Sequence, residues 1–376
     1  MELSKNRGKQ MKKTSLFLAL VLLLSSFLVA CSNGNGENKA ANNQEANNAS
    51  EEPAKEAGKD FDLSVGFVTD EGGINDQSFN QGVHEGLLKA EKDLGIKQSY
   101  QESKVAADYA KNMDTLLDAD NDLIVAAGFK LADDVEKKAK ENPDVNFLIV
   151  DYAYDDAPDN LTGIVFQAEQ PSFLVGYIAG RTTETNKVGF VGGQEGNVIS
   201  GFDYGYEAGV KYAAKELGKE ITVTKQYVGN FSDVPKAKSI TQTMFNGGCD
   251  VVFHAAGDAG TGVIEAAKEA GKWAIGVDKD QNELAPDNVL TSAMKRADVA
   301  IYNILKDMSE GKDFPGGQTI TYSLKDGDAV DIAPSSNKNV KPEILEEIPK
   351  LKDKIIKEEI KVPYNAETFK EFEKTL

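Results

Sequence analysis

From residue 61 onward, short runs of apolar residues alternate with segments whose apolar residues recur every three or four positions. Uninterrupted apolar runs are typical of strands buried on both faces, whereas the three- and four-residue spacing indicates amphipathic helices. In the first half the predicted strands are 63–68, 98–102, 122–127, 146–151 and 161–167, and the predicted helices are 78–94, 106–119 and 131–140. This alternation predicts a parallel sheet covered by helices on both faces.

The same alternation begins again near residue 170. The predicted helices are 171–182, 201–217, 233–246, 260–270 and 298–310, and the predicted strands are 187–191, 221–227, 250–254, 273–277 and 289–292. The remaining segment, 319–376, contains short strand-like runs and charged helical stretches. Its Lys and Glu runs are interpreted as solvated helix faces.

The two halves are related by an internal repeat. Residues 65–68 (VGFV) recur as residues 188–191, and the same offset of 123 residues relates Phe79 to Phe202, Gly86 to Gly209 and Gly95 to Gly218. One offset therefore pairs a strand, an aromatic residue, a helical glycine and a helix-ending glycine. This indicates an α/β protein with two Rossmann-like, doubly wound lobes of common design.

The amino-terminal residues predict secretion. Basic residues precede apolar runs at 16–24 and 27–30, so residues 1–30 have the pattern of a signal peptide, and Met1 and Met11 are both plausible starts. The run ends in Leu28-Val29-Ala30-Cys31, which resembles a bacterial lipobox, in which the Cys becomes acylated. The alternative is an ordinary signal peptide with a chance cysteine. Residues 31–60 contain no large apolar residue and are predicted to be a flexible tether. We therefore expect lipid anchoring on the extracytoplasmic face of the cell membrane.

Composition narrows the range of partners. The formal net charge of −19 argues against nucleic acid as a partner, while a small neutral or cationic ligand remains compatible. The two Cys and two His residues lack metal-ligand spacing, so neither a metal site nor a cofactor is predicted. Cys249 precedes an apolar run and is expected to be a buried thiol.

Candidate ligand groups follow from the repeat, because ligands of doubly wound sheets bind beyond the carboxyl ends of the strands. Phe79 and Phe202 follow the first strand of each lobe, and Asp151 and Asp278 each end a later strand. Two aromatic rings from opposite lobes would hold a flat ring, and two carboxylates would accept hydrogen bonds from ring N–H groups or sugar hydroxyls. A nucleoside has both features. The alternative for each Phe is a core position in its own lobe.

Five segments together resemble the basic membrane protein (BMP) family. They are VGFVTDEGGINDQSFNQGVHEG from residue 65, VGFVGGQEGNVISGFDYGYEAG from 188, HAAGDAGTGV from 254, GVDKDQ from 276 and TSAMKRADVAIYNI from 291. The family comprises lipoprotein substrate-binding components of ABC transporters and includes purine nucleoside receptor A-like proteins. The resemblance implies a type I periplasmic-binding-protein fold with three crossovers. The expected first lobe is 61–167 plus about 293–322, and the expected second lobe is 168–292 plus about 323–376.

The resemblance also implies roles for individual residues. Phe79 and Phe202 would stack on the base of the nucleoside. The other implied contacts are Asp70, Asn80 and Asp151 at the polar edge of the base, Gly257, Asp278 and Lys295 at the ribose hydroxyls, and, more weakly, Asp76, Ser78 and Asp258. Asp76 or Ser78 could equally cap the following helix, and Lys295 follows a strand close to a predicted crossover.

The implied function is capture of a nucleoside of the guanosine, inosine or adenosine type and its delivery to a membrane permease, with acylated Cys31 holding the protein on the bilayer. Two alternatives remain open at this stage: the same fold binding a sugar or another small polyol, and a secreted nucleoside-processing enzyme. The sequence contains no Gly-x-Ser-x-Gly elbow, Cys–His pair or metal cluster, which favours a binding protein over an enzyme. His254 is the residue to examine for proton transfer.

Overall fold

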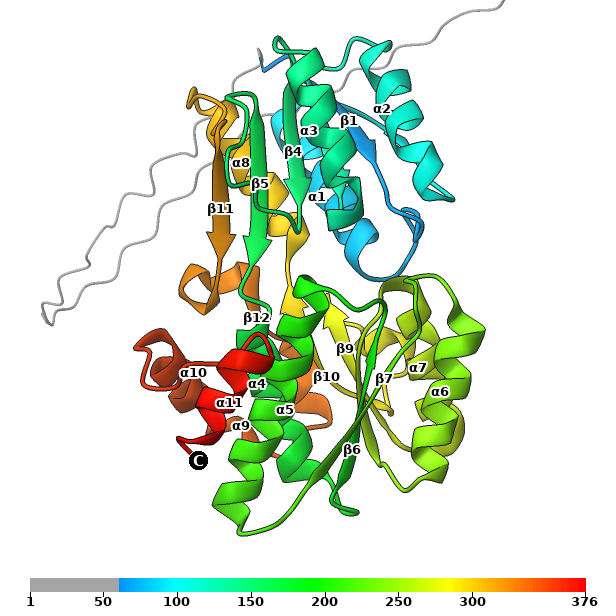
Figure 1. Cartoon of the computed structure of the whole chain (residues 1–376), viewed down its shortest axis with the longest axis vertical. Helices are drawn as coiled ribbons and strands as arrows, with labels where there is room; N and C mark the ends of the chain where they lie inside the picture. The colour runs from blue at the N-terminus through cyan, green and yellow to red at the C-terminus, as the bar shows by residue number, and fades with distance from the viewer. Residues whose placement is uncertain (1–60) are drawn as a thin grey trace, which may run out of the picture. The chain divides into compact units, whose positions relative to one another are not determined.

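A computed structural model describes residues 61–376 (Figure 1). Each of its two lobes is built on a six-stranded sheet with helices on both faces. The strand orders are β11-β5-β4-β3-β1-β2 and β12-β10-β9-β8-β6-β7. The two orders are equivalent strand for strand, so the predicted repeat corresponds to one architecture used twice. The signal peptide, Cys31 and the tether lie outside the described residues.

The first lobe follows the predicted alternation. Its elements are β1 (Ser64–Val68), α1 (Phe79–Leu94), β2 (Lys97–Gln101), α2 (Tyr109–Leu117), β3 (Leu123–Ala127), α3 (Ala132–Glu141), β4 (Asn146–Val150), β5 (Leu161–Phe166), α8 (Ala297–Ser309) and β11 (Gln318–Tyr322). All strand pairs of this sheet are parallel. Every residue of the central strand β3 is buried, as expected for an apolar strand covered on both faces.

The second lobe repeats this arrangement and adds short helices at the carboxyl end. Its elements are α4 (Glu169–Thr182), β6 (Lys187–Gly192), α5 (Asn197–Leu217), β7 (Thr222–Tyr227), α6 (Val234–Asn246), β8 (Val251–Ala255), α7 (Gly260–Ala270), β9 (Trp273–Asp278), β10 (Val289–Lys295), β12 (Val330–Ile332), α9 (Pro342–Leu345), α10 (Ile348–Ile356) and α11 (Ala366–Glu373). Only β12 runs antiparallel to its neighbour among these described strands. The predicted buried thiol is confirmed, since Cys249 packs beside Met244 and Val252.

The chain crosses between the lobes three times: from β5 to α4, from β10 to α8, and from β11 to β12 (Figure 1). The helix after each of the first two crossovers docks on the helix that follows β1 or β6, the first strand of its lobe. Thus α4 packs on α5, and α8 packs on α1. The predicted type I periplasmic-binding-protein fold is confirmed by these two sheets and three crossovers.

The repeated glycine has a packing role in both lobes. A Cβ atom at Gly86 would lie 2.7 Å from the backbone oxygen of Asp298, and one at Gly209 would lie 2.0 Å from that of Phe173. Both distances are far below van der Waals contact, so glycine is required where the crossover helix meets α1 or α5. The two C-cap glycines of the repeat, Gly95 and Gly218, both adopt the left-handed conformation.

Two details differ from the sequence-based expectation. Strand β10 continues to Lys295, and residues 293–295 pair with β12, so they belong to the second sheet rather than to the expected first-lobe segment. Helix α5 begins at Asn197, four residues before the predicted start. The apolar pair Val198-Ile199 lies in this additional turn and supplies the burial that extends the helix.

Candidate functional site: a cavity between the lobes

A cavity lies between the two lobes at the carboxyl ends of the strands. The space between its side chains, open solvent included, is about 510 Å³. The sequence-predicted residues that line it are Asp70, Asp76, Phe79, Asn80, Asp151, Phe202, Gly257, Asp258, Asp278 and Lys295. Ser78 is the one predicted residue that does not line this cavity.

The loop between β1 and α1 supplies the acidic wall of the first lobe. One Asp70 oxygen, Oδ1, accepts hydrogen bonds from the Gly72 amide at 2.9 Å and from Asn80 Nδ2 at 2.7 Å. Asp76 accepts hydrogen bonds from the backbone amides of Ser78, Asn80 and Gln81. Asp76 therefore caps α1. The Gly72 amide and the Asn80 side chain hold Asp70 at the cavity wall.

Ser78 has a different role from the capping role considered for it. Its side chain makes no capping hydrogen bond. Its hydroxyl instead donates to Asp278 Oδ2 at 2.5 Å, which joins the loop of the first lobe to the end of β9 in the second. Ser78 therefore orients a cavity carboxylate rather than lining the cavity itself.

Lys295 lies at the centre of the site, at the end of β10 and just before a crossover. Its ammonium group donates to Asp151 of the first lobe at 2.5 Å and lies 3.6 Å from a carboxylate oxygen of Asp278 in the second. It also lies 4.3 Å from the ring centroid of Phe79 and 5.7 Å from that of Phe202. One buried lysine thus contacts groups from both lobes, in place of the surface position that a lone lysine would usually have.

The two aspartates that flank Lys295 occupy equivalent positions. Asp151 follows β4 and Asp278 ends β9, and both have positive φ values, 71° and 64°. Aspartate adopts this left-handed conformation more readily than most residues. The turn directs both carboxylates to the end of the sheet, where the cavity lies.

Burial shifts the ionisation of the acidic groups. It raises the pKa of Asp70 to about 6, although hydrogen bonds from Gly72 and Asn80 act in the opposite direction. It also raises the pKa of Asp278 to about 6, against the opposing effects of Lys295 and Ser78. Burial alone would lower the pKa of Lys295, but Asp151 and Asp278 outweigh it, and the net shift is upward. Lys295 therefore stays charged while two carboxyl groups titrate close to neutral pH.

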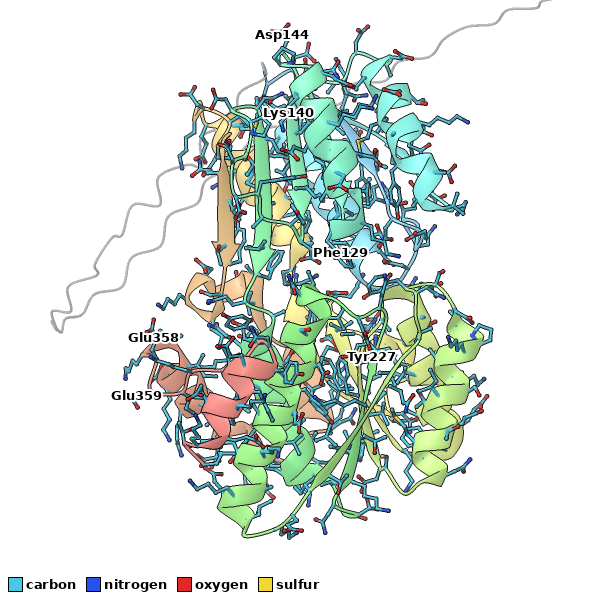
Figure 2. The ribbon with its side chains drawn as sticks, viewed as in Figure 1. Phe129, Lys140, Asp144, Tyr227, Glu358 and Glu359 are labelled. Carbon is cyan, nitrogen blue, oxygen red and sulfur yellow. The ribbon has the colours of Figure 1, made fainter. Side chains whose placement is uncertain are left out.

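The aromatic walls include residues that the sequence reasoning did not select. Phe129 of the first lobe and Phe231 of the second line the cavity and meet edge to face, with ring centroids 6.3 Å apart. In Figure 2 the labelled Phe129 lies where the first lobe meets the second. Phe129 directly follows Gly128 at the end of β3, so position after a strand end was a signal that could have found it. Phe231 lies in a loop, and nothing in the repeat marks it.

The early start of α5 adds two further lining residues, Val198 and Ile199. It also means that Phe202 enters the cavity from the second turn of its helix, whereas Phe79 is the first residue of α1. Phe202 packs against Phe253, with ring centroids 6.4 Å apart. The two rings predicted to act together therefore come from different depths of their helices.

His254 lies in β8, and Gly257 lies just after the end of this strand in the second lobe. His254 is fully buried and does not line the cavity, and its Nε2 lies 2.9 Å from Gln281 Oε1. Burial lowers its pKa to about 4. Gly257 has a φ of 56°, and a Cβ atom there would lie 3.3 Å from Phe231, so the glycine brings backbone close to this aromatic wall. Among residues 61–376, no group of His, Cys, Asp and Glu residues has a geometry that could hold a metal ion.

Comparison with known proteins places the chain in a family. Residues 63–366 match the family model of the Bmp proteins, described as ABC transporter substrate-binding proteins that are PnrA-like. The chain belongs to this family. The predicted resemblance to basic membrane proteins is thereby confirmed, and the general function of the Bmp family is that of a solute-binding component of an ABC transporter.

Individual relatives agree with this membership. The chain is 38% identical to the CD4+ T-cell-stimulating antigen of Listeria innocua, over 94% of this chain and 99% of that protein. It is 39% identical to basic membrane protein A of Borreliella burgdorferi, over 82% of this chain and 90% of that protein. A solved solute-binding protein of an ABC transporter system from Aeropyrum pernix superimposes with a TM-score of 0.74 at 27% identity, covering 82% of this chain and 96% of the other.

The Bmp family acts on the extracytoplasmic side of the membrane. None of the helices described for residues 61–376 combines the length and apolar character needed to cross a membrane. The family model and the solved neighbour are both described as substrate- or solute-binding proteins of ABC transporters.

Proposed function

We propose that this protein captures purine nucleosides in the cavity between its lobes and delivers them to a membrane permease. The single observation that carries the proposal is the composition of the cavity: an aromatic ring from each lobe, Phe79 and Phe202, beside a set of buried carboxylates and one lysine. A purine offers a flat face to the rings, and its N–H groups and the ribose hydroxyls offer donors to the carboxylates.

The charge balance of the cavity supports a neutral ligand over a phosphorylated one. Five aspartates line the cavity, and Lys295 is the only lysine or arginine among its lining residues. Lys295 already contacts Asp151 and Asp278. A phosphate placed about 5 Å from one uncompensated carboxylate would lose about 3 kcal/mol at an effective dielectric constant of about 20. We therefore expect a nucleoside 5′-monophosphate to bind about 100-fold more weakly than its nucleoside.

Capture follows from the position of the crossovers. In this proposal the ligand enters while the lobes are apart, and rotation about the three crossovers buries it between them. The closed form then docks on the permease, and the tether and acylated Cys31 keep the protein at the membrane surface. A single acyl chain gives only weak and reversible membrane binding. The several acyl chains of a bacterial lipoprotein would give stable anchoring.

The test is isothermal titration calorimetry of the purified protein with guanosine, inosine, adenosine, cytidine, uridine, free bases, ribose and guanosine 5′-monophosphate. Purine nucleosides should bind, and the monophosphate should bind about 100-fold more weakly. Alanine at both Phe79 and Phe202 should abolish detectable binding, while Phe245→Ala on α6, away from the cavity, should not. Affinity for ribose but for no nucleoside would favour the polyol alternative, and product formation during incubation would favour the enzyme.

A further inference from the structure

Gln281 connects the interior of the second lobe to the backbone of the first. It is almost fully buried and lies just after β9. Its Oε1 accepts a hydrogen bond from the Val277 amide at 2.9 Å and lies 2.9 Å from His254 Nε2. Its Nε2 donates across the lobe boundary to the backbone oxygen of Gln77 at 2.9 Å.

The position of the proton on His254 follows from the groups that face Oε1 of Gln281. The Val277 amide can only donate, so the atom facing it must be the oxygen of the Gln281 amide. His254 Nε2 faces the same oxygen and must therefore carry a proton. Its Nδ1 has no hydrogen-bond partner among the described residues. This atom packs against Gly260, and a Cβ atom at position 260 would lie only 2.0 Å from it. A protonated Nδ1 would leave a buried N–H unsatisfied, which disfavours both the other tautomer and the imidazolium.

The end of this chain of contacts is the loop that forms the acidic wall of the cavity. Gln77 precedes Ser78 and Phe79 and has a φ of 56°, a left-handed conformation that is unfavourable for glutamine. Two further contacts join the same pair of segments: Ser78 with Asp278, and Glu85 with Lys279 at 2.6 Å. The segment 277–281 thus contacts the loop and the first helix of the other lobe at three places.

We propose that Gln281 is an interlobe latch, and that His254 is the positioning residue that keeps its amide turned for closure. Oε1 of Gln281 accepts hydrogen bonds from His254 Nε2–H and from the Val277 backbone amide. This orientation of the side chain points Nε2 of Gln281 toward the Gln77 carbonyl. Removal of the His254 donor leaves the Val277 amide as the only group among residues 61–376 that holds Oε1, so the hydrogen bond across the lobes is positioned less firmly. His254 therefore acts through Gln281 and transfers no proton.

Opening of the lobes separates Gln281 from Gln77, so the latch contributes only to the closed form. A ligand that requires closure then binds more weakly when the latch is lost, although none of the latch residues touches the ligand. The loss of one buried hydrogen bond corresponds to about a 3- to 10-fold weaker affinity. A carboxylate at position 281 should have a larger effect, since it places an acceptor against the Gln77 carbonyl.

The test compares four variants of the purified protein with the wild type: Gln281→Glu, His254→Phe, His254→Gln and, as a matched control, Gln318→Glu at an exposed position of β11. With guanosine as the probe, Gln281→Glu should weaken affinity at least tenfold and His254→Phe about 3- to 10-fold. His254→Gln should restore affinity, because a glutamine amide can supply a donor where Nε2–H lies. The control should bind as the wild type does.

The latch rests on the proposed function only in the choice of guanosine as the probe. Two measurements need no ligand and therefore test the latch separately from the proposed function. Long-range nitrogen–proton NMR should show His254 as the neutral Nε2–H tautomer. Small-angle scattering of the unliganded protein should show a smaller closed fraction for Gln281→Glu than for the wild type. An Nδ1–H tautomer, or wild-type closure in Gln281→Glu, would overturn the latch whether or not nucleosides bind. Failure of every nucleoside with both results as expected would overturn the proposed function alone.

Discussion

Replacement of Lys295 by Met tests how the charges at the centre of the site are balanced. Lys295 is 4% exposed and lies 2.5 Å from Asp151 and 3.6 Å from Asp278. Methionine has a similar length and removes the charge with little loss of volume. The variant leaves two buried carboxylates facing each other without a cation.

The size of the effect follows from these distances. At an effective dielectric constant of about 20, one pair at 3.6 Å gains about 5 kcal/mol from Coulomb attraction. Removal of the ammonium also removes its desolvation penalty of several kcal/mol, which offsets part of the loss. We expect a net decrease of about 3–5 kcal/mol in the free energy of unfolding at pH 8, the range found when one partner of a buried ion pair is removed.

The decrease should depend on pH. A carboxyl whose folded-state pKa is raised stabilises the protein below its unfolded pKa and loses that contribution as pH rises through the folded value. Asp278 already has a raised pKa of about 6 with Lys295 present, and loss of the lysine raises it further. The deficit of Lys295→Met should therefore be largest at pH 8 and smaller at pH 5, where one carboxyl takes up a proton.

Urea unfolding at the two pH values measures this difference. The single tryptophan, Trp273, begins β9, the strand that ends at Asp278, and reports on the second lobe by fluorescence. Lys279→Met is the control, because the Lys279–Glu85 pair is partly exposed and should contribute at most about 1 kcal/mol. A loss below about 1 kcal/mol at pH 8, or an equal loss at both pH values, would refute the reasoning.

Two further predictions concern packing and ligand affinity. Gly86→Ala places a Cβ atom 2.7 Å from the Asp298 backbone oxygen and should lower the free energy of unfolding by about 1–3 kcal/mol. Gly82→Ala meets no atom within 4 Å and should raise the free energy of unfolding by about 0.5–1 kcal/mol. Urea unfolding measures both values, and a greater loss of stability in Gly82→Ala than in Gly86→Ala would contradict this prediction. Guanosine affinity should fall as pH drops from 7.5 to 5, since Asp70 and Asp278, each with a pKa of about 6, lose an acceptor on protonation. Calorimetry across this range should show the decrease, and a flat profile would exclude these carboxylates as acceptors.

The alternation of apolar runs and amphipathic segments determined the fold class, because periodicity records directly which faces of an element are buried. The internal repeat determined more. It paired Asp151 with Asp278, which share a left-handed backbone conformation in the structure. It also paired Gly86 with Gly209, each of which lies against the backbone of a crossover helix. Equivalent positions in equivalent sheets end at the same edge, so the repeat also indicated which residues share the cavity.

Only the tertiary structure decided which group each of these residues contacts. No spacing in the chain indicates that Lys295 lies between Asp151 and Asp278, since the three are brought together by the crossover after β10. Phe231 and the contact of Ser78 with Asp278 were missed for the same reason: each depends on how one lobe meets the other. A sequence pattern records burial along one element, whereas a site between lobes depends on contacts between residues far apart in the chain.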